Sequence, residues 1–362
     1  MISAIEHHKF NDDLLLAPED RDLAARKYPS IVHVLDHPKL REVFAHYDRP
    51  ANRAKRRAQK AGFWAVGLIW AALAIAAAEH LAPDAWGRAR SLFTAVSGIC
   101  GLFGVIICST SILFGNKKRE WLERRLMTER IRQFHFQTFV CRTRDVLHSL
   151  GNDDAKESFI SERALWFQEF LAKFEGKLDS QLADILSDER QQNIWLHRAT
   201  NEEPDPDSPA LNYLFAAYRE LRIVHQIGYA NYNLQDDGRI FSKVPLRQSV
   251  VLSSFGFICF IVIGVLHIGV LAWPDKASII SLTIIWIALA ALAARAISDG
   301  LQPEREAERY QQYRSAVQFV LERFDRAQSQ AEKLQVMREM ERLSFDEMRN
   351  FLVSGNRSRF VM

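Results

Sequence analysis

The residues whose types and spacing could support chemistry are few, and none of them forms an established catalytic pattern. The sequence contains no glycine-rich phosphate loop, no H-E-x-x-H zinc motif and no G-x-S-x-G nucleophile motif. An Arg separated by four to six residues from a His, a spacing found in helical ribonucleases, occurs at Arg142 and His148, Arg190 and His197, and Arg219 and His225. The abundance of Arg and the 11 His predict such matches by chance, so we predict that the chain is not an enzyme. Unchanged function after joint mutation of the three histidines would exclude RNA cleavage.

The four cysteines form no metal or disulfide motif. Cys100, Cys108 and Cys259 lie within apolar stretches, and Cys141 lies in a predicted helix. No two of them have the CxxC spacing that is typical of zinc ligands. We therefore expect neither a metal ion nor any other cofactor.

One stripe of small residues runs along an apolar stretch. Ser97, Gly101, Gly104 and Cys108 follow one another at i, i+4, i+7 and i+11, which places them on one face of a helix. Small residues allow two helices to approach closely in lipid. The stripe predicts a helix-packing interface, and the alternative is the wall of a narrow pore.

Two ionisable residues, His267 and Arg295, interrupt other apolar stretches. An ionisable group inside a membrane is a candidate functional residue. Arg295 can instead extend its guanidinium to the membrane surface, and a neutral His267 can form a hydrogen bond to a neighbouring helix. Both interpretations are open from the sequence.

Four long apolar runs contain these residues and must position them. They cover residues 61–78, 91–115, 248–273 and 277–297. A helix needs about 20 mostly apolar residues to cross a hydrocarbon core, and lipid requires every backbone hydrogen bond to be made internally. The runs therefore predict four transmembrane helices in two hairpins, rather than four buried helices of a soluble core. The rest of the chain is predicted to be helical, so the fold class is an all-α membrane protein.

The distribution of Lys and Arg predicts the orientation of the hairpins. Basic residues concentrate on the long segments outside the hairpins, whereas the two short connections hold only Arg88, Arg90 and Lys276. An excess of Lys and Arg marks the cytoplasmic side, so both termini are expected in the cytoplasm. The clusters that flank the first hairpin are Arg53, Lys55, Arg56, Arg57, Lys60, Lys117, Lys118 and Arg119. Such clusters can also attract anionic lipid.

This orientation divides the chain into five segments. A cytoplasmic N-terminal segment, the first hairpin, a cytoplasmic helical domain, the second hairpin and the cytoplasmic C-terminal helices cover residues 1–60, 61–115, 116–246, 247–297 and 298–362. The 47 Lys and Arg are interleaved with 44 Asp and Glu, for a net charge of +3. This balance does not favour direct binding of nucleic acid.

Helical patterns fill the cytoplasmic segments. Residues 120–150 predict one uninterrupted helix, and residues 151–154 predict a stop followed by a new N-cap. An amphipathic helix is expected to follow as far as Ile185, and another over residues 210–233, with an exposed acidic and proline-rich loop at 202–209.

A heptad-like stripe runs from Tyr310 to Leu334. This pattern suits packing along another long helix or along a second copy of the chain. It therefore predicts a coiled-coil contact that could support a homo-oligomer.

The sequence after the first hairpin, of the form W-x-x-R-R…E-R-I-R, is similar to a bacterial family. Its residues are Trp121, Arg124, Arg125, Glu129, Arg130 and Arg132. A second segment that carries the resemblance precedes the other hairpin, and its residues are Arg219, Glu220, Leu221, Arg222, Gln226 and Tyr229. The chain thereby resembles the SMODS- and SLOG-associated transmembrane effectors, the SLATT group and its four-helix relatives. The resemblance implies antiphage defence, in which a nucleotide second messenger or a partner sensor triggers membrane disruption.

Together these observations predict an oligomeric protein of the bacterial inner membrane that permeabilises or depolarises the bilayer on a cytoplasmic signal. The alternative function is a non-conducting scaffold that recruits a cytoplasmic partner. The expected partners are the lipid bilayer, further copies of the chain, and a cytoplasmic sensor protein or nucleotide second messenger.

Overall fold

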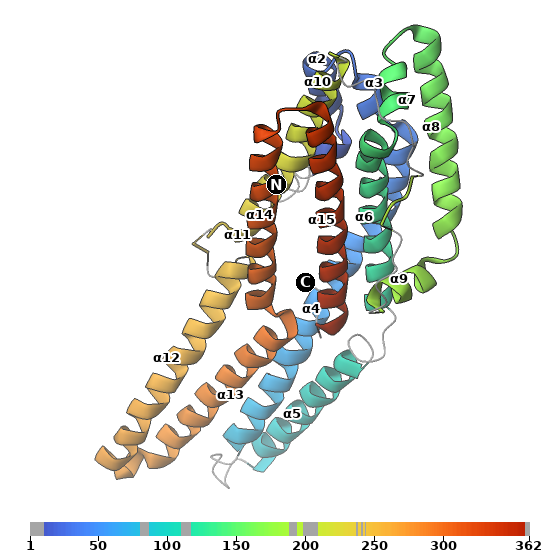
Figure 1. The fold of residues 1–362 in the computed structure, drawn as a ribbon. Helices are drawn as coiled ribbons and strands as arrows, with labels where there is room; N and C mark the ends of the chain where they lie inside the picture. Colours follow the sequence, from blue (N-terminus) through green and yellow to red (C-terminus); the bar gives the residue numbers. More distant parts are fainter. Residues whose placement is uncertain are drawn as a thin grey trace. The chain divides into compact units, whose positions relative to one another are not determined.

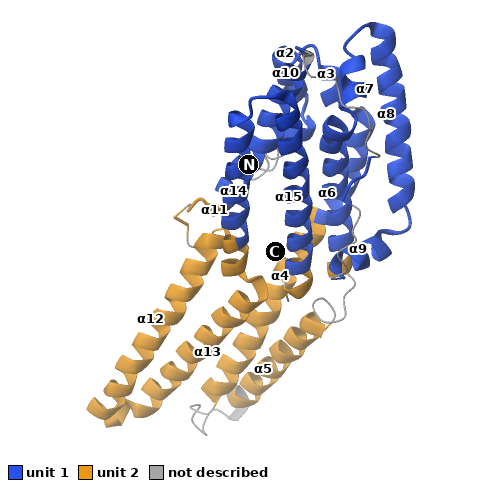
Figure 2. Cartoon of the chain, in the orientation of Figure 1, with its two compact units in different colours: residues 1–51, 121–233, 309–354 blue, residues 52–120, 234–308, 355–362 orange. Residues whose placement is uncertain are grey.

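The computed structural model describes residues 11–79, 87–109, 117–187, 194–197, 209–236, 238–239, 242 and 244–358, and these residues contain no β-strand. The predicted all-α fold is therefore confirmed (Figure 1). The chain divides into two compact units (Figure 2). Unit 1 comprises residues 1–51, 121–233 and 309–354, and unit 2 comprises residues 52–120, 234–308 and 355–362.

Unit 1 is built from helices drawn from three separate stretches of the chain. The first stretch supplies η1 (Asp12–Leu14), α2 (Pro18–Lys27), α3 (Val32–Leu35) and the start of α4 (Pro38–Glu79). The second supplies α6 (Lys117–Cys141), α7 (Thr143–His148), α8 (Asp153–Phe174), α9 (Leu178–Leu186), α10 (Ala210–Tyr218), the π-helical η4 (Arg219–Val224) and α11 (His225–Leu234). The third supplies most of α14 (Pro303–Arg326) and α15 (Gln330–Arg357).

Helix α6 lies at the centre of unit 1. Every residue from 130 to 141 is buried, so the helix is covered on all its faces. The ring of Phe134 lies 5.2 Å from that of Phe167 and 5.0 Å from that of Phe170, both on α8. Because α6 also carries buried Arg130 and Arg132, its position in the core requires partners for these charges.

One predicted helix start is confirmed, and two helices end earlier than predicted. Asn152 caps α8, since its Oδ1 accepts a hydrogen bond from the backbone N of Ala155 at 2.8 Å. The predicted helix over 120–150 breaks at Arg142, between α6 and α7. The amphipathic helix expected to reach Ile185 ends at Phe174, because Gly176 adopts a φ of +66° that other residues rarely adopt.

The heptad-like stripe from Tyr310 to Leu334 does not lie on one helix. It crosses the end of α14 at Arg326 and the start of α15 at Gln330. Its residues Tyr313, Val317 and Phe324 are buried in the core of unit 1. The stripe therefore packs inside the chain, which is the first of the two predicted alternatives, and contact with a second copy stays a prediction. Of the predicted loop at 202–209, only Pro209 is described.

Unit 2 contains the apolar helices. They are the later part of α4, α5 (Gly87–Ile107), α12 (Pro245–Ala272) and α13 (Ala277–Leu301), with the short η5 (Pro274–Lys276) between the last two. Helices α12 and α13 pack against each other, and Trp286 Nε1 on α13 donates a hydrogen bond to the carbonyl of Ala74 on α4 at 3.0 Å. Residues 110–115 of the second predicted run lie outside the described residues.

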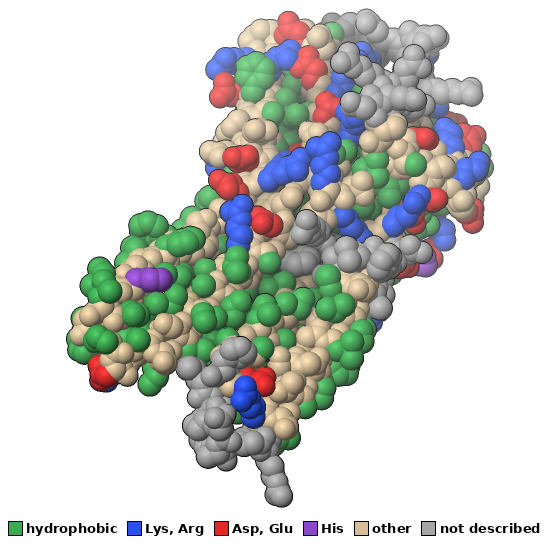
Figure 3. Space-filling model, turned by 90° about the horizontal axis from the view of Figure 1, so that it is seen from below, with side chains coloured by type: hydrophobic (Ala, Val, Ile, Leu, Met, Phe, Trp, Pro, Cys, Tyr) green, Lys and Arg blue, Asp and Glu red, His purple; other side chains and the backbone are tan. Residues whose placement is uncertain are grey.

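Within the described ranges, four helices are long and apolar enough to cross a membrane, which confirms this part of the prediction. In their most apolar windows between 0% and 17% of the residues are buried, so most of the hydrophobic side chains face outward. Figure 3 shows these side chains gathered over the helices of unit 2. Exposed apolar patches on soluble monomers rarely exceed a few hundred Å². The surface is instead typical of helices that contact lipid.

Candidate functional site

Three of the four small residues predicted on one face of α5 contact α4. The hydroxyl of Ser97 donates a hydrogen bond to the carbonyl of Ala72 at 2.9 Å. A Cβ added to Gly101 would lie 3.6 Å from the Cβ of Ala72, and one added to Gly104 would lie 2.8 Å from Cγ1 of Ile69. These contacts correspond to the helix-packing interpretation. Cys108 is half-buried near the end of the described part of α5.

The two ionisable residues of the second pair of apolar helices lie apart from each other. His267 is exposed, and its Nδ1 donates a hydrogen bond to the carbonyl of Ile263, one turn earlier on α12, at 2.8 Å. Arg295 pairs with Asp299 on α13 at 3.1 Å, and both side chains are more than half exposed. Each group thus has a local partner on its own helix.

The basic clusters beside the first hairpin fall into two kinds. Arg53, Arg56, Arg57, Lys60 and Arg119 are exposed, and Lys55 is half-buried. The side chain of Lys118 is fixed in position, because its Nζ donates hydrogen bonds to the carbonyls of Asn356 and Ser358, each at 2.6 Å. Burial there lowers its pKa. The side chain of Lys117 lies outside the described part.

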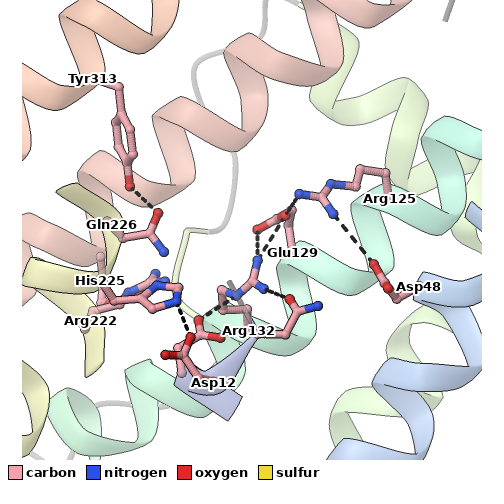
Figure 4. Close-up of polar contacts among 12 residues, drawn as sticks. Asp12, Asp48, Arg125, Glu129, Arg132, Arg222, His225, Gln226 and Tyr313 are labelled. Carbon is pink, nitrogen blue, oxygen red and sulfur yellow. Dashed lines mark hydrogen bonds and ion pairs between the residues drawn. The ribbon is translucent and has the colours of Figure 1, made fainter. Parts of the chain in front are cut away.

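A partly buried ion network in unit 1 brings together charged residues that the sequence did not predict as a site (Figure 4). Arg132 lies at its centre: its Nε is 2.8 Å from Oδ2 of Asp13, and its Nη1 is 3.1 Å from Oε2 of Glu129. The same glutamate accepts from Arg125 at 2.5 Å, and Arg125 also lies 3.9 Å from Asp48. We call Asp13, Asp48, Arg125, Glu129 and Arg132 the ion network.

The positions of these residues on three elements explain how the ion network forms. Arg125, Glu129 and Arg132 follow one another at i, i+4 and i+7 on α6, so they share one helix face. Asp13 comes from η1 and Asp48 from α4. The network therefore ties the two N-terminal elements to the central helix.

A second charge pair lies deeper in unit 1. Arg222 and Glu341 are 2% and 0% exposed, and their side chains meet through two parallel hydrogen bonds of 2.9 and 3.1 Å. Tyr218 donates a third hydrogen bond to the same carboxylate at 2.7 Å. The guanidinium also lies 4.5 Å from the ring centroid of Phe136 on α6. The pair thus joins η4, α15 and α6.

Polar contacts continue along α11 in the same unit. His225 Nε2 lies 2.7 Å from Oδ1 of Asp12, and Tyr313 donates a hydrogen bond to Gln226 at 3.1 Å. Tyr229 and Tyr310 share a hydrogen bond of 3.2 Å between their hydroxyls. The π-helical η4 precedes these residues, and π-helical turns are rare and frequently lie at functional sites. The helical register of η4 determines the directions in which the side chains of α11 point.

The charges in these contacts hold one another ionised. Burial alone would raise the pKa of Glu129, but Arg125 and Arg132 outweigh this effect and hold it below its usual value. Burial alone would lower the pKa of Arg222, but Glu341 outweighs this and raises it. Burial next to Glu341 raises the pKa of Tyr218 far above its usual value, so it remains a hydrogen-bond donor. Mutually neutralised charges of this kind favour helix arrangements that keep the charges paired.

The contacts include residues from both segments that carry the family resemblance. Arg125, Glu129 and Arg132 belong to the first segment. Arg222 and Gln226 belong to the second. The helical spacing of opposite charges on α6 is the signal that could have predicted ion pairs among these residues, although not their partners from other elements. Within the described residues, no group of His, Cys, Asp and Glu could hold a metal ion.

Three buried histidines of unit 1 predict that its stability falls in mild acid. Burial lowers the pKa of His37 to about 3, that of His197 to about 4, and that of His135 well below its usual value. Such a histidine binds its proton only on unfolding. Its contribution to the free energy of unfolding is therefore complete above pH 6.5, where the histidine of the unfolded chain is neutral. This contribution is lost as the pH falls towards the pKa of the histidine in the folded state.

We expect the free energy of unfolding to fall between pH 6.5 and 4.5, by up to about 1.4 kcal/mol per pH unit for each of these histidines. Denaturant titrations at several pH values measure this slope. The variant H37Q/H197Q should have a clearly smaller slope, because it lacks two of the responsible groups. An unchanged slope in that variant would show that the acid response has another origin.

Comparison of the chain with protein-family models, with curated proteins and with solved structures gives no match.

Proposed function

We propose that the chain is a membrane effector: unit 2 crosses the bacterial inner membrane with four helices, and unit 1 receives a cytoplasmic signal. The observation that carries the proposal is the outward-facing apolar surface of α4, α5, α12 and α13. Phe257 and Leu271 on α12 are 68% and 82% exposed, which water would strongly disfavour and hydrocarbon would not. Lipid is the partner that fits this surface.

The charge contacts of unit 1 support a role in signalling. An ion pair as deeply buried as Arg222 and Glu341 gives little net stability compared with apolar residues, but it strongly disfavours arrangements that separate the two charges. A unit held by several such pairs favours a few discrete arrangements of its helices. A ligand that binds one arrangement better than another would then shift the population.

The output we propose is permeabilisation or depolarisation of the membrane by an oligomer. The similarity of the Trp121 to Arg132 segment to antiphage effectors supports this output and a nucleotide second messenger or sensor protein as the trigger. Four helices are too few to surround a wide aqueous path, so several copies would be needed.

One observation favours a second function, that of a non-conducting scaffold. Ser97 and Gly104, the residues suited to line a narrow pore, contact α4 of the same chain. A scaffold would use the membrane helices only as an anchor, while unit 1 recruits a cytoplasmic partner.

Measurement of the membrane potential distinguishes the two functions. We expect that cells expressing the chain lose the potential-dependent signal of a fluorescent dye within minutes of phage infection. Cells expressing the double variant R222M/E341L, which replaces the buried charge pair, should keep their potential if this pair transmits the signal. An intact potential in the wild type under phage challenge, together with a stable complex on affinity purification, would contradict the effector function and support the scaffold.

A further inference from the structure

Helix α4 carries an exposed cationic face immediately before its apolar run. Arg53, Arg56, Arg57 and Lys60 occupy positions i, i+3, i+4 and i+7, which lie on one side of a helix. All four side chains are exposed. Ala54, which lies between Arg53 and Arg56 in the sequence, is half-buried. We call these four residues the cationic face.

Three of the four residues of the cationic face have no acidic residue near them along their own helix. No Asp or Glu occurs between Asp48 and Glu79. Among the described residues, Arg56, Arg57 and Lys60 have no hydrogen-bond or ion-pair partner. Other cations near the apolar helices differ, as Lys118 is bound to backbone carbonyls. Cations that serve only to fix the orientation of a helix need no common face.

The same face continues into two exposed aromatic residues. Phe63 and Trp64 follow Lys60 at i+3 and i+4, and they are 47% and 65% exposed. Aromatic side chains favour the boundary between hydrocarbon and headgroups. Four helical residues rise about 6 Å, which matches the thickness of one headgroup layer, about 5–8 Å. With Trp64 at the hydrocarbon boundary, Lys60 and Arg57 reach the level of the lipid phosphates.

We propose that the cationic face binds the headgroups of anionic phospholipids in the leaflet where α4 enters the membrane. Arg56 and Arg57 can each hold a phosphate oxygen pair through two parallel hydrogen bonds. Lys60 adds a point charge at the same level. The inference rests on the proposed membrane location of unit 2 and adds its lipid partner.

Quenching of Trp64 fluorescence by brominated lipids tests the inference. The full chain is purified in detergent and reconstituted into vesicles of phosphatidylcholine and phosphatidylglycerol. In one sample only the phosphatidylglycerol carries brominated acyl chains, and in the other only the phosphatidylcholine does. The difference between the wild type and W64F isolates the signal of Trp64. A single basic residue near an anionic surface contributes a factor of about five. We therefore expect a preference for phosphatidylglycerol near Trp64 of at least about fivefold at low salt, and little preference at 1 M salt.

Three variants separate the effect of the cationic face from that of total charge. The variant R53Q/R56Q/R57Q/K60Q should lose the preference. An equal loss of charge at exposed positions of unit 1 should leave it intact, and the control variant is K39Q/K173Q/K177Q/R326Q. The charge-conserving variant R53K/R56K/R57K should retain most of it, since the attraction is mainly electrostatic.

The outcomes also separate this inference from the proposed function. Equal quenching by the two brominated lipids would overturn lipid recognition and leave the cationic face as an orientation signal. Absence of quenching by either lipid would overturn the membrane location and the inference together. Preference for phosphatidylglycerol in a protein that never alters the membrane potential would support the inference and contradict the effector function. Salt-sensitive binding of single-stranded RNA that displaces phosphatidylglycerol would overturn the lipid assignment.

Discussion

Replacing Arg222 with alanine is expected to lower the free energy of unfolding of unit 1 by about 3–5 kcal/mol. The side chain is 2% exposed, and its removal leaves the carboxylate of Glu341 buried without its counter-charge. The contact with the ring of Phe136 is lost as well. Thermal unfolding of the detergent-purified chain measures the effect, and we expect the midpoint to fall by about 10 °C.

The matched control is Arg219→Ala, one turn earlier on η4. Arg219 pairs with Asp325 at 2.7 Å, but the two side chains are 42% and 44% exposed. Water screens such a pair, so its loss should cost about 0–1 kcal/mol. The double variant R222M/E341L should recover much of the stability lost in R222A, because it leaves no buried charge. Similar effects of R219A and R222A would contradict the central role of the buried pair.

Replacing Gly104 with leucine is expected to force α4 and α5 apart. A Cβ at this position would lie 2.8 Å from Cγ1 of Ile69, 3.2 Å from its backbone N and 3.3 Å from the carbonyl oxygen of Ala65. The side chain of Ile69 can move, but the two backbone atoms cannot without shifting the helix. Overpacking of this kind typically costs about 1–3 kcal/mol. The measurement is the denaturation of the first hairpin in SDS and detergent mixtures, followed by the distance between spin labels on α4 and α5.

Gly98 on the same helix provides the control. A Cβ at Gly98 would meet nothing within 4 Å, so Gly98→Leu should leave the distance between the two helices unchanged. It adds an apolar side chain to a surface that we assign to lipid. If G98L and G104L behaved alike, the small residues of α5 would not form the α4 interface, and the pore-wall interpretation would regain support.

The long apolar helices could be predicted from the sequence because their length and composition are local properties. A run of about 20 apolar residues is visible without knowledge of any neighbour, and the 91–115 run is such a case. The N-cap at Asn152 was also predictable, since the cap depends on residues within one helical turn.

The organisation of unit 1 could not be predicted in the same way. Its core contains residues far apart in the chain, such as Leu35, Phe134 and Met340. No local sequence pattern predicts that these residues share one core. The break at Arg142 occurs in a segment of strong helix formers, so tertiary packing overrides the local preference there. The heptad-like stripe likewise left open whether it packs within the chain or against a second copy, and only the tertiary structure places Val317 and Phe324 in the chain's own core.

The charge contacts were visible in the sequence only as a pattern of residue types. Arg125, Glu129 and Arg132 could have formed an exposed face of ion pairs, which is the usual role of charges at helical spacing. Their significance depends on the burial of α6 and on Asp13, which lies more than 100 residues earlier. Tertiary structure therefore supplied the partners.

The most direct test of the membrane location is labelling of single cysteines in intact cells. In a chain whose four native cysteines are replaced by alanine, Asp275→Cys places a thiol in η5 between α12 and α13, and Lys177→Cys places one in unit 1. A maleimide that cannot cross the inner membrane should label the thiol at position 275 in intact cells, and the thiol at position 177 only after the membrane is disrupted. Labelling at position 177 in intact cells, or protection at position 275, would contradict two membrane-crossing helical pairs with unit 1 in the cytoplasm.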